Sequence, residues 1–140
     1  MFRRILLAYD DSAPARKAFD RLLKTLADPN AELAILSVIR SSEFAVEGCA
    51  QSALDGAMAH LMRQAGQLQQ RAALVGLKAS AMVRIGHPAR QIALAAEEWR
   101  ADLIVTGRRP PIPFVPWLWL TSSVSSQVLA LARCAVLVVP

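Results

Sequence analysis

Apolar positions along the chain follow two alternating patterns, which predict five strands and four helices. Five short runs are rich in apolar residues, and most are continuously apolar, as strands buried on both faces are. These runs occupy residues 5–9, 33–39, 79–84, 103–106 and 135–139. Between them, apolar residues recur at the spacing of amphipathic helices. The alternation indicates an α/β fold with a parallel sheet and helices on both faces.

The helical segments carry recognisable start signals. The first helix is predicted to begin at the cap residue Ser12, with Pro14 in its first turn, and the last at Ser122 or Ser123. In the last helix, the side chains expected to face the core are those of Val124, Val128, Leu129 and Ala132. A long helix over residues 50–75 is predicted by one apolar stripe, made of Leu54, Met58, Leu61, Ala65, Leu68 and Ala72.

Length and charge narrow the classes of function. A chain of 140 residues is expected to form one domain, residues 1–140. The net charge is +5, but the 16 basic residues are scattered among 11 acidic ones with no run of five like charges. This pattern favours a solvated basic surface, so we expect no nucleic-acid partner.

Cysteine usage and apolar segments bear on location. Cys49 and Cys134 do not make a disulfide framework. The apolar stretch near the N-terminus is too short for a secretory signal, and residues 112–120 are far shorter than the roughly 20 residues that span a bilayer. The expected location is the cytoplasm.

The candidate chemistry centres on residues 101–129. A buried strand leads to Gly107, Arg108 and Arg109, then to a loop rich in prolines and aromatic residues, then to the helix start at Ser122 and Ser123. Ligands of open α/β sheets bind beyond the carboxyl ends of the strands, and helix starts favour phosphate. The stretch is therefore a candidate phosphate site.

Other nucleotide or phosphate folds fit less well. A phospho-acceptor receiver domain would explain Asp10 and Asp11, but it needs an aspartate at the end of the third strand and a lysine after the fifth. The third strand here ends in Arg84, and the chain ends at Pro140. A Walker A loop and a G-x-G-x-x-G fingerprint are also absent from the sequence.

Several segments together resemble the universal stress protein family over essentially the whole chain. They are ILLAYDDS, Leu36-Ser37-Val38, Gly86-His87-Pro88-Ala89, ADLIVTGRR, SSVSSQVL and CAVLVVP. The resemblance implies a five-stranded parallel sheet in the order 3-2-1-4-5, a dimer, and a role in stress survival or regulation without firm catalytic activity.

The family's ATP-binding members follow G-x-x-G, a spacer, and a glycine before serine or threonine. Gly107 matches the first glycine, Pro110 stands in place of the second, and Ser122 in place of the third. Proline has no N–H to donate and fixes its own φ. The loop contains four prolines, at Pro110, Pro111, Pro113 and Pro116, and so loses phosphate donors.

Some binding elements of the family remain. The candidate nucleotide-binding residues are Asp10, Ser12, Val38, Gly107, Arg108, Arg109, Ser122 and Ser123. By the resemblance, Asp10 lies near adenine or a metal and Val38 lines the base pocket. Structural interpretations stay open: the acids favour a helix N-terminus, the serines cap a helix, Val38 is core, and the arginines are solvated.

Two surfaces are candidates for partners. The final strand is an apolar sheet edge by the resemblance, and it invites pairing with a second copy through Ala135, Val136, Leu137, Val138 and Val139. Phe114, Trp117 and Trp119 either fold back into the nucleotide pocket or form a contact for a protein or a membrane surface.

Catalysis is the weakest hypothesis, because no nucleophile–base pair is recognisable and His60 and His87 have no ligand or triad partner nearby in the sequence. The sequence therefore predicts a homodimeric stress-response or regulatory module with a degraded nucleotide-binding loop and no cofactor. The alternative is an ATP- or AMP-binding regulatory module with a remodelled loop, in which slow ATP hydrolysis would need bound nucleotide.

Overall fold

The computed structural model describes residues 1–26, 28–41, 50–108 and 123–140. Five strands and four helices alternate along the chain. They are β1 (Arg4–Ala8), α1 (Ala13–Thr25), β2 (Glu32–Ile39), α2 (Ala50–Leu74), β3 (Lys78–Ile85), α3 (Pro88–Trp99), β4 (Leu103–Gly107), α4 (Val124–Leu131) and β5 (Ala135–Val139). The predicted alternation is confirmed, with element ends shifted by a residue or two.

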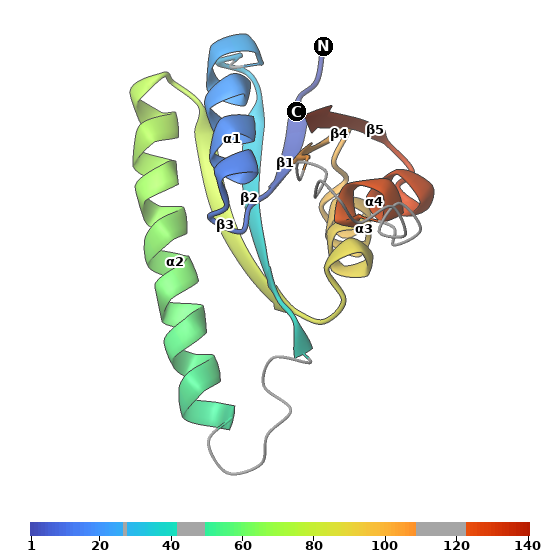
Figure 1. Ribbon diagram of the computed structural model, residues 1–140. Helices are drawn as coiled ribbons and strands as arrows, with labels where there is room; N and C mark the ends of the chain where they lie inside the picture. The colour runs from blue at the N-terminus through green and yellow to red at the C-terminus, as the bar shows by residue number, and fades with distance from the viewer. Residues whose placement is uncertain (27, 42–49, 109–122) are drawn as a thin grey trace.

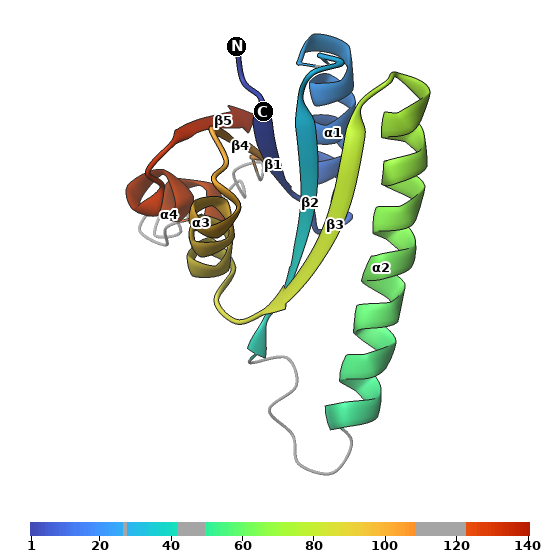
Figure 2. The same ribbon diagram turned by 180° about the vertical axis from the view of Figure 1, so that it is seen from behind.

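The strands form one sheet in the order β3-β2-β1-β4-β5, and every strand pair is parallel, as predicted. Helices α1 and α2 cover one face of the sheet, and α3 and α4 cover the other (Figures 1 and 2). This arrangement places β1 at the centre, with β5 and β3 at the two edges.

Two apolar cores lie on the two faces of the sheet. Alternate residues of β1 point to opposite faces, so Ile5 and Leu7 join one core while Leu6 joins the other. The first core includes Phe19 of α1, and the second includes Ile92 of α3. The central strand is thus buried on both faces, as its continuous apolar run predicts.

The last helix differs in one detail from its prediction. Leu129 was expected to point inward, but it is 54% exposed, whereas Ser125 is buried beside Val128. Successive helical residues are about 100° apart. Leu129 therefore lies on the flank of the inward face, which is formed by Val124, Ser125, Val128 and Ala132. In the described part of the chain, no helix is both long enough and apolar enough to cross a membrane.

Candidate functional site

A cavity of about 410 Å³ lies where the central strand ends. Strand β2 pairs with β1 only as far as Leu36 and then continues through Ile39 paired with β3 alone. Strand β4 pairs with the other side of β1. The end of β1 therefore opens a crevice between its neighbours, the place where ligands bind in sheets of this kind. The volume falls in the range of small-molecule sites.

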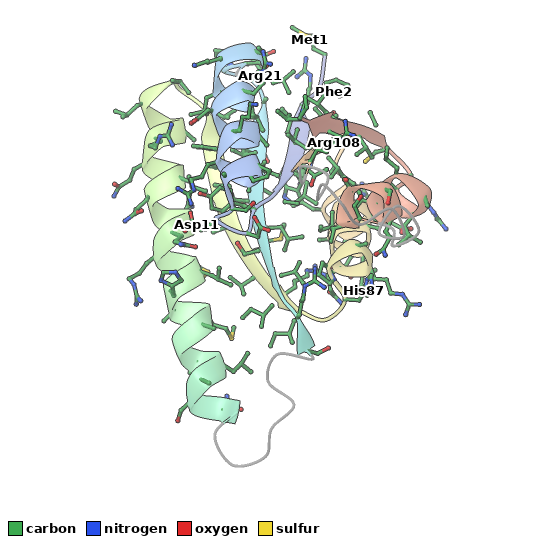
Figure 3. All side chains as sticks on the ribbon, in the orientation of Figure 1. Met1, Phe2, Asp11, Arg21, His87 and Arg108 are labelled. Carbon is green, nitrogen blue, oxygen red and sulfur yellow. The ribbon has the colours of Figure 1, made fainter. Side chains whose placement is uncertain are left out.

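The turn after β1 is fixed by side-chain hydrogen bonds. Asp11 adopts a left-handed conformation, with φ of 61°. Its carboxylate accepts hydrogen bonds from the Tyr9 hydroxyl at 3.0 Å and from Gln64 Nε2 of α2 at 2.7 Å, and it pairs with Arg16 Nε at 3.5 Å. Figure 3 shows Asp11 at the start of α1, on the side of α2. These bonds hold the neighbouring residues Asp10 and Ser12 in the lining of the cavity.

The two neighbours of Asp11 have structural partners of their own. The Asp10 carboxylate accepts the backbone N–H of Ser12 at 3.0 Å. The Ser12 hydroxyl accepts the backbone N–H of Ala15 at 3.2 Å, so Ser12 caps α1 as predicted. Both residues are therefore held in the lining of the cavity by structural hydrogen bonds.

Tyr9 lies beneath this turn and is 6% exposed. Burial, the hydrogen bond to Asp11 and the charge of Asp11 together raise the pKa of Tyr9 to about 12. The phenol is therefore neutral at physiological pH. It acts as a donor that holds the Asp11 carboxylate and as part of the cavity wall.

Strand β2 supplies the next wall. The Ser37 hydroxyl donates to the Tyr9 carbonyl at 2.9 Å, which ties β2 to β1 beyond their last backbone pair. Val38 follows it, half-buried and in the lining of the cavity. Val38 is thus a core residue of the α3 and α4 face and a cavity residue at once.

Strand β4 ends against the first turn of α1. A Cβ added to Gly107 would lie 2.5 Å from the carbonyl carbon and oxygen of Pro14, so no larger residue fits there. The glycine that matched the phosphate motif is therefore required for packing, whatever its role toward a ligand. Thr106, buried beside it, also lines the cavity.

Helix α4 brings a cluster of hydroxyls to the same place. The Ser123 hydroxyl accepts the backbone N–H of Ser126 at 3.2 Å, so Ser123 is the cap of α4. It also lies 3.1 Å from the hydroxyl of Ser125, which is 8% exposed. Both serines line the cavity. Ser125 was absent from the candidate residues because its buried position depends on how α4 packs.

The fourth wall comes from α2 and the end of β2. Ala57, His60 and Leu61 line the cavity from α2, and Arg40 lines it just after β2. Neither His60 nor Arg40 was among the candidate binding residues. No short-range motif signals either residue, because they reach the cavity only when the long helix folds back along the sheet.

The predicted binding residues divide into three groups. Asp10, Ser12, Val38, Gly107 and Ser123 are brought together around the cavity. Arg108 is exposed and is not among the described lining residues; its backbone N–H donates to the Val139 carbonyl at 2.8 Å, and Figure 3 shows it beside β5. Arg109 and Ser122 lie outside the described residues, as do Phe114, Trp117 and Trp119.

Comparison with known proteins gives a consistent result. The sequence model of the universal stress protein family matches residues 1–140. A relative from Thermus aquaticus, a universal stress protein encoded in the 3′ region of QAH/OAS sulfhydrylase, is 35% identical over 141 residues, with 99% of each chain covered. A solved structure of a family protein from Burkholderia pseudomallei is 28% identical, with a TM-score of 0.79 and coverage of 98% of this chain and 95% of that one.

Two structures with the same fold contain nucleotides. A universal stress protein in complex with cAMP is 22% identical, with a TM-score of 0.74 and coverage of 99% of this chain and 96% of that one. A family protein from Arabidopsis thaliana with AMP bound is 17% identical, with a TM-score of 0.72 and coverage of 98% and 90%. At these identities the similarity establishes the shared fold.

Proposed function

Because the chain belongs to the universal stress protein family, we propose that it is a cytoplasmic regulatory module whose cavity binds an adenine nucleotide, with weak affinity for ATP. The observation that carries the proposal is the cavity at the end of β1, which gathers Asp10, Val38 and Ser123 from three separate elements. We assign it no catalytic step.

The lining suits the nucleoside part of such a ligand. Apolar side chains, including Leu36, Val38 and Leu61, offer surface for a flat base. Hydroxyls of Ser37, Thr106 and Ser125 lie among them as a few placed polar groups. A mostly apolar pocket with a few convergent polar groups is typical of a small-molecule site. The AMP and cAMP seen in two proteins of the same fold support this choice of ligand.

The sequence argues against strong binding of the phosphates of ATP. Two of the three glycines of the family's phosphate motif are replaced, at Pro110 and Ser122. Proline donates no backbone hydrogen bond, and convergent backbone N–H groups are what favour anions in such a loop. Gly107 is required for packing against Pro14, so its presence in the sequence is not evidence that ATP binds. We expect an ATP Kd weaker than about 100 μM, or roughly −5.5 kcal/mol.

Isothermal titration of nucleotide-free protein with adenosine, AMP, ADP and ATP tests the proposal. Adenosine and AMP are expected to bind, with ATP weaker than AMP. Ala57→Phe should abolish binding by filling the cavity, whereas Ala73→Phe, at an exposed position of the same helix, should leave it intact. Failure of every adenine compound to bind would overturn the proposal, and a low-micromolar Kd for ATP would overturn its second part.

We further propose that the protein is a homodimer paired through β5. Strand β5 is an edge of the sheet and is apolar along its whole length, from Ala135 to Val139. Leu137 is 37% exposed there. An apolar edge strand is a template for pairing with a copy of itself, and two such edges related by a two-fold axis close the assembly.

Sedimentation velocity at micromolar concentration tests the dimer. The wild type is expected to sediment as a dimer and Leu137→Lys as a monomer, because a lysine opposes edge-to-edge pairing. Leu94→Lys is the matched control, since Leu94 is 45% exposed but lies on α3. A monomeric wild type, or equal effects of the two substitutions, would contradict pairing through β5.

A further inference from the structure

Polar groups around the cavity separate by burial into a floor and a rim. The floor is neutral: Ser37, Thr106 and Ser125 are between 3% and 8% exposed. The rim is polar and exposed: Asp10 and Arg40 carry charges there, and His60 is a third exposed residue of the lining. A nucleotide has the same division, because its nucleoside is neutral and its phosphate is anionic. Such a ligand would place its nucleoside toward the floor and its phosphate at the rim.

Arg40 lines the rim of the cavity and differs from several other arginines in having no carboxylate partner among the described residues. Among the described residues, the ion pairs of arginine are Arg4–Glu32, Arg16–Asp11, Arg71–Asp20, Arg84–Glu98 and Arg133–Glu97. Arg40 makes no ion pair within that part of the chain, and no other arginine lines the cavity there. A guanidinium without a carboxylate partner beside a cavity attracts an anionic ligand.

We propose that Arg40, assisted by His60, recognises the phosphate of the bound nucleotide. This inference rests on the proposed function and deepens it. The phosphate would lie on the wall made by β2 and α2, away from the family's glycine motif, whose second and third glycines are replaced here.

Charge also sets the class of ligand. The Asp10 carboxylate on the same rim repels phosphate, and Arg40 is the single arginine opposing it among the described lining residues. One guanidinium matches one phosphate through paired hydrogen bonds, but it leaves the remaining charge of a triphosphate uncompensated. The charge at the rim therefore favours an adenine nucleotide with one phosphate, linear or cyclic, over one with three, where adenine is taken from the proposed function.

Titration calorimetry with AMP and adenosine on single variants tests this assignment. Arg40→Gln should weaken AMP binding about tenfold, the loss of one charge-assisted contact, and leave adenosine within about twofold. Arg40→Lys should recover part of the loss, and His60→Gln should show a smaller loss for AMP alone. Raising the salt concentration should weaken AMP binding in the wild type more than in Arg40→Gln, because the contact is at an exposed rim.

Arg63→Gln is the matched control, since Arg63 is exposed on α2 outside the cavity lining and its loss changes the net charge equally. It should leave both ligands unaffected. The assignment is overturned if Arg40→Gln leaves AMP unchanged or weakens adenosine equally. It is also overturned if Ser123→Ala, rather than Arg40→Gln, selectively weakens AMP. Binding of neither ligand to the wild type would overturn the proposed function, and a preference of the wild type for ATP over AMP would overturn the ligand class alone.

Discussion

The two halves of α2 carry the same apolar repeat but have different surroundings. In the C-terminal half, Ala65, Leu68 and Ala72 are buried in the core that includes Phe19 of α1. In the N-terminal half, Met58 and Leu61 are only half-buried, and Leu61 lines the cavity. Figure 1 shows that α2 continues past the start of α1, so its first turns have no helix beside them.

The boundary between the halves is set by the start of α1. Gln64 stands between them and donates to Asp11, two residues before α1 begins. Beyond that bond the stripe no longer faces α1, and its apolar side chains become the wall of a cavity. A hydrophobic repeat therefore shows which face of a helix turns inward but does not show whether that face meets core or an opening.

The largest expected effect is a difference in the free energy of unfolding between substitutions in the two halves of α2. Leu68→Ala should lower the free energy of unfolding by about 3 kcal/mol, because it empties a site in the closed core. Leu61→Ala should cost about 1 kcal/mol, since a half-buried side chain loses fewer contacts. Denaturant unfolding of both variants measures the difference, provided that the slope with denaturant is unchanged.

The two substitutions should have the opposite order of effect on ligand binding. Leu61→Ala is expected to weaken adenosine binding because Leu61 lines the cavity, whereas Leu68→Ala should bind normally once folded. Equal losses of stability would show that both halves of α2 belong to one continuous core.

Elements defined by local signals could be predicted from the sequence. Buried strands follow from continuous apolar runs, and the caps Ser12 and Ser123 follow from serine beside a helical pattern. Asp10 and Val38 came from the resemblance and do lie at the cavity. The strands and the caps depend on a few consecutive residues, so a short stretch of sequence is enough to indicate them, whereas Asp10 and Val38 needed the resemblance over the whole chain.

Features made by distant segments could not be predicted. Arg40 and His60 share the cavity rim only because α2 runs back along β2 and β3. The close approach of Gly107 to Pro14 depends on how tightly β4 packs against α1. The motif alone therefore indicated a phosphate-binding role for Gly107 and not its role in packing. The exposure of Leu129 likewise depends on which face α4 turns toward α3 and β5.

A smaller effect is expected at the boundary itself, from Asp11→Asn. Asparagine also tolerates the left-handed backbone found at residue 11, so the substitution mainly removes the negative charge. Asp11 accepts from Tyr9 through Oδ1 and from Gln64 through Oδ2, whereas asparagine has one acceptor oxygen, so the Gln64 amide must turn over to keep its hydrogen bond. Together with the loss of the ion pair with Arg16, this should cost about 1 kcal/mol at this partly exposed site. The cavity turn would loosen without loss of the fold.

Tyr9 reports this change directly, because it is the one tyrosine of the chain. Burial and Asp11 raise its pKa to about 12 in the folded protein, above the ordinary value near 10. The folded state therefore holds the phenolic proton more tightly. This contribution to stability is complete below about pH 10 and is lost as the pH rises toward 12.

In Asp11→Asn the phenolate absorbance should titrate at lower pH than in the wild type, though still above 10 because burial remains. Asp55→Asn, which removes a surface charge in the N-terminal half of α2, should leave the titration unchanged. An unaltered Tyr9 midpoint in Asp11→Asn would show that Asp11 does not couple the end of β1 to α2, and that the division of the helix has another origin.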